Sequence, residues 1–278
     1  MSRLPEPASL VGATGLSPAS HLQRVLLSEL GRLSSLPTPG PRRRPLEDGP
    51  GPFEAALRSA QAARGGAVIA EYKQASPSLG PFAAGTPLLP QLEAYRDGGA
   101  AALSILAEPA LFRGAAADLQ RARGIGLPRL YKGFVISEAQ LAEAEEAGAE
   151  AVLLIARVLG EHTPAFARAA RERGLEPLVE LHDLTEVGFA QAASARLVGI
   201  NARDLSTFTL GVPSAEPLRK AFPSAILIRE SGLATPEDAR AALRAGFDAV
   251  LIGEALMRSP DPAGFLRRTL ANLGAGVP

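Results

Sequence analysis

Residues 244–252 read RAGFDAVLI, and two earlier segments, EAGAEAVLL (146–154) and DGGAAALSI (97–105), repeat nearly the same order of residue types. In each segment an acidic residue or an arginine precedes a glycine, and a short apolar run follows. The glycine is typical of a helix end, and the apolar run is typical of a buried β-strand. The recurrence of this phrase indicates an internal repeat of similar helix–strand units.

Eight apolar runs alternate with segments of helical period from about residue 67 onward. They are AVIAEY (67–72), AALSIL (101–106), PRLYK (128–132), AVLLIA (151–156), EPLVEL (176–181), RLVGIN (196–201), AILIRE (225–230) and AVLIGE (249–254). Their ends recur every 20 to 35 residues, which is enough for one strand, one helix and two loops. Eight such units predict an α/β fold with a single closed (β/α)8 barrel, a TIM barrel, over residues 67–278.

A doubly wound open sheet is the alternative fold. Such a sheet normally has fewer strands, and its dinucleotide-binding form has a glycine-rich turn after the first strand, where this chain reads EYKQASPS.

Helix boundaries between the runs are also marked. TPED (235–238) predicts a capped helix start that Gly246 ends, and Ser137 begins another helix that Gly148 ends.

Residues 1–66 form an N-terminal extension with a different pattern. HLQRVLLSELGRL (21–33) predicts an amphipathic helix. Its apolar face carries Leu22, Val25, Leu26, Leu30 and Leu33. A linker rich in Pro and Gly (37–51) separates it from a second short helix at about 53–64. We expect the first 18 or so residues to be mobile, and the amphipathic helix either to cap one barrel end or to reach over the active-site mouth.

Composition excludes several function classes. The 29 basic and 29 acidic residues balance without a long run of like charge, so a nucleic-acid surface is not expected. The absence of cysteine excludes disulfides, thiolate metal sites and cysteine nucleophiles, and the three histidines have no metal-ligand spacing. No apolar run approaches 18 residues and no signal core is visible. We therefore expect a cytoplasmic protein with no membrane partner. The expected assembly, which composition does not determine, is a monomer or weak homodimer.

Only three of the basic residues are lysine, and Lys73 and Lys132 stand where predicted strands end. An ammonium group can give up a proton, whereas a guanidinium group cannot do so at neutral pH. In a barrel of this kind the carboxyl ends of all strands face one mouth. The polar residues at these ends are Glu71, Lys73, Ser76, Ser104, Lys132, Glu180, Asn201, Arg203, Glu230, Ser231 and Glu254.

Each of these residues taken singly is explained by a strand end that meets water, but the whole ring predicts an active site. Lysines and glutamates that converge in one mouth can move a lysine or a glutamate pKa toward neutrality, which supplies a general acid and a general base. ESGL (230–233) and GEAL (253–256) follow the last two strands, where this fold forms phosphate sites from backbone N–H groups. A phosphorylated small molecule is therefore the expected substrate class.

Seven segments together resemble the motifs of the indole-3-glycerol phosphate synthase family in order and spacing. They are AVIAEYKQASPSLGPF, LSILAEPALFRG, RLYKGFVIS, LVELHD, GINARDL, ESGLATPEDA and VLIGEALMR. The resemblance covers about residues 50–270. It implies closure of the pyrrole ring of 1-(2-carboxyphenylamino)-1-deoxyribulose 5-phosphate, with loss of CO2 and water and with no cofactor or metal.

The resemblance also implies residue roles. Lys132 would be the general acid at the substrate ketone. Lys73 with its partner Glu71 would hold the substrate carboxylate, and the division of the acid role between Lys73 and Lys132 stays open. Glu180 with Asn201 would transfer protons during dehydration. Ser231 and Glu230 would line the site, and Ser104 and Leu106 would contact the substrate. The remaining implied contacts are Ser76 and Arg203 for substrate positioning, Phe112 and Phe134 for the aromatic ring, and Ser76, Gly232, Gly253 and Glu254 for the phosphate.

Four positions depart from the usual family pattern. Gly133 replaces an aspartate after the acid lysine, Gln74 replaces an arginine, Leu79 replaces a lysine, and Gly211 replaces an aspartate. These changes leave the catalytic positions in place but alter the charge of the loops. Other functions remain open at this point: a Schiff-base aldolase with Lys132 as nucleophile, a binding subunit with a vestigial site, and the isomerase of the same pathway, whose usual cysteine base this chain lacks.

Overall fold

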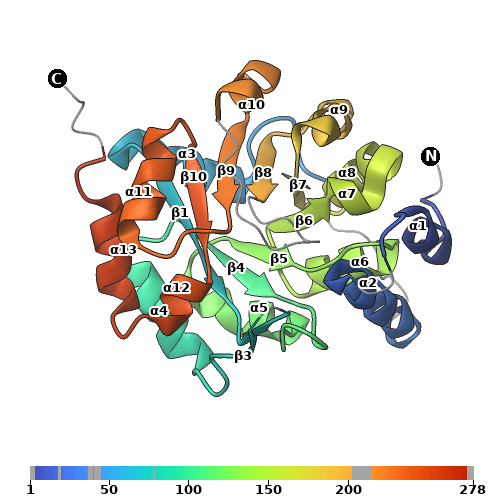
Figure 1. Cartoon of the computed structure of the whole chain (residues 1–278), viewed down its shortest axis with the longest axis horizontal. Coiled ribbons are helices and arrows are strands. Elements are labelled where there is room, and N and C mark those ends of the chain that lie inside the picture. Colours follow the sequence, from blue (N-terminus) through green and yellow to red (C-terminus); the bar gives the residue numbers. More distant parts are fainter. Residues whose placement is uncertain are drawn as a thin grey trace.

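The structure is a computed structural model that describes residues 4–17, 20–36, 40, 45–77, 79–201 and 215–273. Within these residues eight parallel strands close into one barrel in the order β1-β10-β9-β8-β7-β6-β5-β4 (Figure 1). The strands are β1 (Ala67–Tyr72), β4 (Ala102–Leu106), β5 (Arg129–Lys132), β6 (Ala151–Ile155), β7 (Glu176–Leu181), β8 (Leu197–Asn201), β9 (Ile226–Glu230) and β10 (Ala249–Ile252). Each predicted run holds one strand, so the barrel is confirmed and the open sheet is excluded.

Helices surround the strands (Figure 1). They are α3 (Pro52–Arg64), α4 (Leu88–Asp97), α5 (Ala116–Arg121), α6 (Glu138–Glu146), α7 (Ala156–Leu159), α8 (Thr163–Glu172), α9 (Val187–Ala192), α10 (Ala215–Ala221), α11 (Pro236–Arg244), α12 (Glu254–Arg258) and α13 (Pro262–Leu270). A two-stranded hairpin, β2 (Ala75–Ser76) with β3 (Gly80–Pro81), follows β1. Among the described residues no helix combines the length and the apolar character needed to cross a membrane.

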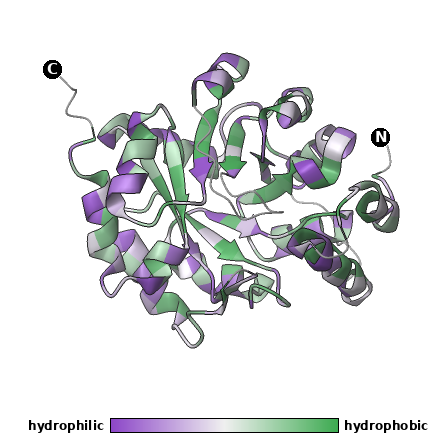
Figure 2. Ribbon diagram, viewed as in Figure 1, coloured by the Kyte–Doolittle hydropathy of each residue, from purple (hydrophilic) through white to green (hydrophobic). Residues whose placement is uncertain are grey.

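The barrel core follows from the continuous apolar runs. All residues of β1, β6, β7, β9 and β10 are buried. Parallel strands covered on both faces have no solvent side, so their sequences do not alternate between apolar and polar residues. Figure 2 shows this as predominantly hydrophobic strands inside helices of mixed hydropathy.

Both marked helix starts lie where the sequence predicts them. Thr235 and Asp238 form a reciprocal capping box at the start of α11, and Gly246 follows that helix with φ +96°. Ser137 stands at the N-cap of α6, but its side chain makes no capping hydrogen bond. The sequence therefore marks where each helix begins. Whether the N-cap side chain forms a capping hydrogen bond depends on the local backbone.

In the described part of the N-terminal extension, two α-helices precede α3, namely α1 (Pro7–Ala13) and α2 (His21–Arg32). Residues 4–17, which we expected to be mobile, include α1, whose Leu10 and Val11 are buried. The predicted amphipathic helix is α2, and Leu22, Val25 and Leu26 of its apolar face are buried. Figure 1 shows α1 and α2 together on the side of the barrel that carries α6 and α7.

Candidate active site

The carboxyl ends of the strands surround one cavity of about 640 Å³. Helix α2 contributes His21, Leu22 and Val25 to its wall, so the extension reaches over this mouth, as one of the two expected placements had it. The predicted site residues that line the cavity are Glu71, Lys73, Ser76, Leu106, Phe112, Lys132, Phe134, Glu180, Asn201, Glu230, Ser231, Gly232, Gly253 and Glu254.

One predicted residue is placed differently, and another lies outside the described residues. Ser104 does not line the cavity: its side chain is fully buried on β4 and its hydroxyl donates to Glu71 Oε2 at 3.2 Å. The register pairs Ser104 with Glu71 across β1 and β4, so this serine supports a carboxylate from outside the cavity wall, whereas we expected it to contact the substrate. Arg203 and the departure at Gly211 lie outside the described residues.

Lys132, the last residue of β5, lies among three carboxylates. Its Nζ is 2.7 Å from Glu230 Oε2, 3.6 Å from Glu180 Oε2 and 3.9 Å from Glu71 Oε2. Burial alone would lower the pKa of Lys132, but the charges of the three glutamates outweigh burial and raise the pKa above its ordinary value. The expectation that such a cluster could bring the lysine toward neutrality is therefore wrong for Lys132, which is held as an ammonium ion.

Lys73 forms a second ion pair at the end of β1. Its Nζ is 3.0 Å from Glu71 Oε1, so Glu71 lies between the two lysines. Burial would raise the pKa of Glu71, but the charges of Lys73 and Lys132 together lower it. Gly253 on the neighbouring strand end makes room for this pair, because a Cβ there would collide with Glu71 Oε1. Glu71 is thus an ionised partner of both cations.

Glu230 is the carboxyl group in the cluster that gains a proton. Burial raises its pKa to about 8, and the nearby Glu180 adds to the rise against the opposing charge of Lys132. The strand β8 supplies space through Gly199, where a Cβ would collide with Glu230 Oε1. Gly199 was not predicted as part of the site, although a glycine inside an apolar strand run signals a close approach of this kind. Glu230, which accepts a hydrogen bond from Lys132 Nζ, thus keeps its proton to a higher pH than an ordinary glutamate.

The chain turns sharply after β9. Ser231 and Gly232 have φ values of +62° and +72°, a conformation that is uncommon for serine. Such strained backbone persists only where surrounding structure enforces it, and it concentrates at functional sites. Together with Gly253 after β10, this turn brings small residues to the rim of the cavity at the ends of the last two strands.

The opposite part of the cavity wall is aromatic. The ring centroids of Phe112 and Phe134 are 5.9 Å apart and their planes are tilted by 35°. Leu106 and the α2 residues Leu22 and Val25 extend this apolar surface. The cavity therefore has a polar floor with an apolar wall at one side.

Two further residues of the site were not predicted. Arg258 on α12 lines the cavity, with its Nε 3.2 Å from Glu254 Oε1 and its guanidinium over the ring of Phe82. The i,i+4 spacing of Glu254 and Arg258 is the sequence signal for this pair. His182 is buried behind the site, with Nε2 3.4 Å from Glu180 Oε1, and burial lowers its pKa. Its i+2 spacing from Glu180 puts both on one face of the chain.

Known proteins of one family match this chain. The family model for indole-3-glycerol phosphate synthase matches residues 45–269. The indole-3-glycerol phosphate synthase of Deinococcus radiodurans is 44% identical over 226 residues, which cover 79% of this chain and 84% of the relative. The proteins of the same name from Opitutus terrae and Thermococcus kodakarensis are 42% and 40% identical, covering 72% and 76% of this chain and 78% and 95% of those relatives.

A solved structure with the same barrel architecture is thiamine phosphate pyrophosphorylase from Pyrococcus furiosus. It is 14% identical and superposes with a TM-score of 0.53, covering 77% of this chain and 98% of its own. At that identity the likeness concerns the fold alone. The family match extends over most of the chain, including every strand of the barrel. The chain therefore belongs to the indole-3-glycerol phosphate synthase family of enzymes, as its motifs indicated.

Proposed function

We propose that this chain is a carbon–carbon lyase that closes the pyrrole ring of 1-(2-carboxyphenylamino)-1-deoxyribulose 5-phosphate and releases CO2, water and indole-3-glycerol phosphate. The observation that carries the proposal is the ammonium of Lys132, held among Glu71, Glu180 and Glu230 beside an aromatic wall. Ring closure needs a cation at a ketone oxygen, proton transfer next to it and an apolar surface for an aryl ring. All three lie in one cavity.

Lys132 is proposed as the general acid of ring closure. Attack of the ring carbon on the ketone builds negative charge on the oxygen, and a cation placed in advance stabilises this charge more in the transition state than in the ground state. The surrounding carboxylates keep Lys132 protonated before the reaction. Glu230, in hydrogen-bond contact with Nζ, offers a route by which the lysine regains its proton.

Lys73 is proposed to hold the substrate carboxylate until it leaves as CO2. Its ammonium reaches the cavity from the end of β1 and is oriented by Glu71. An anion that approaches Lys73 would lie on the side away from that glutamate, because like charges repel. Glu71 therefore sets the direction of the Lys73 ammonium.

Glu180 and Glu230 are proposed to share the proton transfers of dehydration. Their environments differ, because Glu230 keeps a proton to about pH 8 while Glu180 lies 3.6 Å from the ammonium of Lys132. Such a pair supplies an acid and a base in one site. Asn201, at the end of β8, lines the cavity as the neutral polar group of this region.

The two ends of the substrate are assigned by chemistry. The aryl ring is placed against Phe112 and Phe134, because burial of an aromatic ring next to others is favourable. The phosphate is placed at the ends of β9 and β10, where Gly232 and Gly253 allow close approach of the backbone. Ser76, Glu254 and Arg258 lie along the same cavity, and Arg258 supplies a cation that was not predicted from the sequence.

The test is a fluorescence assay for indoleglycerol formation by the purified full chain from the carboxyphenylamino sugar phosphate. Product formation without added cofactor, lost in a Lys132→Ala variant, would support the proposal. Absence of product from the wild-type chain would contradict it. Borohydride trapping of a sugar phosphate on Lys132 would instead favour a Schiff-base aldolase, which needs a neutral amine that the raised pKa of Lys132 disfavours.

The partner proposed for the chain is thus a small sugar phosphate. We propose that the reaction takes place in the cytoplasm, in a monomer or weak homodimer that binds neither nucleic acid nor membrane. Size-exclusion chromatography with light scattering would test the oligomeric state.

A further inference from the structure

Glu29 is a buried carboxylate in the apolar face of helix α2. The helical spacing of Leu22, Val25, Leu26 and Glu29 puts these four residues on one face, and all are buried. Glu29 is only 1% exposed. A carboxylate in such a position is costly unless it is paired, so its partners define what this face of α2 is held against.

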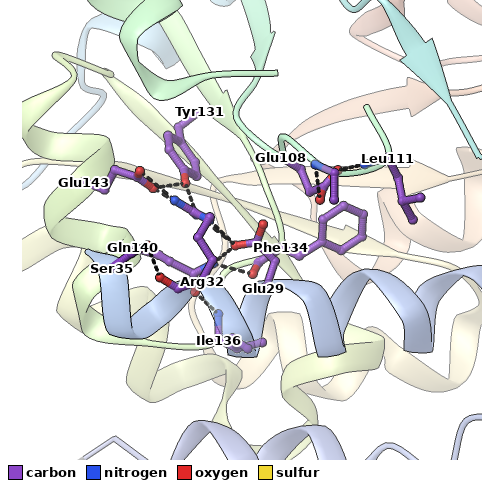
Figure 3. Close-up of polar contacts among 11 residues, drawn as sticks. Glu29, Arg32, Ser35, Glu108, Leu111, Tyr131, Phe134, Ile136, Gln140 and Glu143 are labelled. Atoms are coloured by element: carbon purple, nitrogen blue, oxygen red, sulfur yellow. Dashed lines mark hydrogen bonds and ion pairs between the residues drawn. The ribbon is translucent and has the colours of Figure 1, made fainter. Parts of the chain in front are cut away.

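Arg32 joins Glu29 to the barrel (Figure 3). Its Nη2 donates to Glu29 Oε2 at 2.8 Å, and its Nη1 donates to Glu143 Oε1 on α6 at 2.8 Å. Tyr131 on β5 donates from its hydroxyl to Glu143 Oε2 at 2.6 Å. Helix α2 is therefore fastened to the strand that carries Lys132 and to the helix that follows it.

Gln140 is the second connection, and it reaches the active-site loop itself. Its side chain is fully buried. Its Nε2 donates to Glu29 Oε2 at 2.6 Å and to the carbonyl oxygen of Phe134 at 3.0 Å, while its Oε1 accepts from the backbone N–H of Ile136 at 2.8 Å. One carboxamide thus holds α2 and both sides of the loop between Lys132 and α6.

This loop carries Phe134, one of the two rings of the aromatic wall. A second buried side chain holds the backbone of the other ring, Phe112. Glu108 is 1% exposed, and its carboxylate accepts the backbone N–H groups of Ala110, Leu111 and Phe112. Figure 3 shows Glu108 and Phe134 near Glu29 in one region of the structure. Burial raises the pKa of Glu29, Arg32 opposes the rise, and Glu108 adds to it.

We propose that Gln140 and Glu29 are positioning residues that set the aromatic end of the active-site cavity. They fix Phe134 opposite Phe112 and fix Leu22 and Val25 of α2 above them. The inference rests on the proposed function, because it assigns this end of the cavity to the aryl ring of the substrate. If Gln140 and Glu29 only held the extension in place, their substitution would not affect ligand binding at the aromatic end more than at the phosphate end.

Exchanging the carboxamide of Gln140 and the carboxylate of Glu29 between the two positions tests whether their hydrogen bond sets the aromatic end of the cavity. Gln140→Glu keeps the acceptor for Ile136 but removes both donated hydrogen bonds and sets a carboxylate against Glu29. Glu29→Gln in the same chain supplies a donor that faces the new carboxylate at position 140, so the double variant restores the bond between α2 and α6. Interaction energies of contacting pairs measured in this way commonly reach about tenfold in an equilibrium constant.

Two probes separate the ends of the cavity without relying on turnover. For Gln140→Glu we expect the Kd of anthranilate to rise about tenfold, with partial recovery in the double variant, while the Kd of inorganic phosphate changes less than about twofold. With the full substrate, KM should rise more than kcat falls. If anthranilate and phosphate affinities fall together, or neither falls, the positioning role is wrong.

Glu54→Gln is the matched control. Glu54 is also 1% exposed and bonded to two arginines, Arg58 and Arg196, but it belongs to α3, outside the cavity wall. We expect it to lower the unfolding temperature and leave both affinities unchanged. If Gln140→Glu does not fold, the single variant Glu29→Gln must still raise the Kd of anthranilate more than the Kd of inorganic phosphate. A wild-type chain without lyase activity would contradict the proposed function, whereas the two affinities would still decide the positioning role.

Discussion

Lys132 donates a hydrogen bond to Glu230 across the barrel mouth, with 2.7 Å between Nζ and Oε2, although the two residues are 98 positions apart in the chain. Their strands, β5 and β9, are not neighbours in the barrel. The contact exists because every strand of a closed parallel barrel ends at the same rim. It joins the group proposed as general acid to the carboxyl group with the raised pKa.

Removal of the ammonium should abolish most of the activity. We expect Lys132→Ala to lower kcat by about 10²- to 10⁴-fold, the usual contribution of a positioned proton donor. Product should still bind, because the phosphate and aromatic regions remain. Lys132→Arg should do little better, since a guanidinium group neither releases a proton at neutral pH nor fits the space of an ammonium. Near-normal turnover of Lys132→Ala would remove the assignment.

The activity should fall in alkaline solution. Glu230 is protonated below its pKa of about 8, so rising pH through that value adds a negative charge to the site. The substrate is an anion at both its phosphate and its carboxylate, so kcat/KM should decrease above about pH 8. Glu230→Gln keeps an acceptor for Lys132 and cannot titrate, and its profile should lack this decrease. An unchanged alkaline limb in that variant would assign the ionisation to another group.

Gly133, one of the departures from the family pattern, is explained by its neighbour. A Cβ at position 133 would lie 2.6 Å from Cε1 of the buried Tyr131 ring. We expect Gly133→Ala to cost about 1–3 kcal/mol of unfolding free energy, as overpacking does. The cost should shrink in a Tyr131→Leu background, measured by denaturant unfolding. Gly124→Ala, with open space around it, is the control that should change stability little. Equal costs of Gly133→Ala in both backgrounds would refute the explanation.

The two helix starts give a matched pair for stability. Thr235 accepts a hydrogen bond from the Asp238 N–H at 3.1 Å, whereas Ser137 makes no capping bond. Thr235→Ala should cost about 1 kcal/mol, a fall of about 2–4 °C in Tm for a chain of this size. Ser137→Ala should cost clearly less when both are compared by thermal unfolding. A larger loss at Ser137 would show that N-cap position alone, without the observed bond, determines the effect.

The positions of the barrel strands could be predicted closely. AALSIL (101–106), for example, contains β4 (Ala102–Leu106), and AVIAEY (67–72) coincides with β1. Strands buried on both faces must be apolar throughout, and the polar residue that follows each run marks its end. The set of residues around the mouth followed from the same pattern, since the fold sends all strand ends to one side.

The supporting residues could not be predicted in the same way. Ser104 has the same polar character as its neighbours at other strand ends, but its side chain is behind Glu71 and outside the cavity. Glu29 interrupts an apolar helical face, which is a visible anomaly, yet its partner Gln140 is 111 residues away in the chain. Burial partners at such separations depend on how the extension lies against the barrel, which local pattern does not specify.

The amino-acid sequence by itself determined the strand–helix repeat, the ring of ionisable residues and the family, because these depend on residue type and order along the chain. The tertiary structure decided which carboxylates surround which ammonium. That choice sets the direction of each pKa, because electrostatic energies depend on distances of a few ångströms and on burial. Lys132 is therefore kept charged and Glu230 keeps a proton, a division that identical residues with other spacings would not produce.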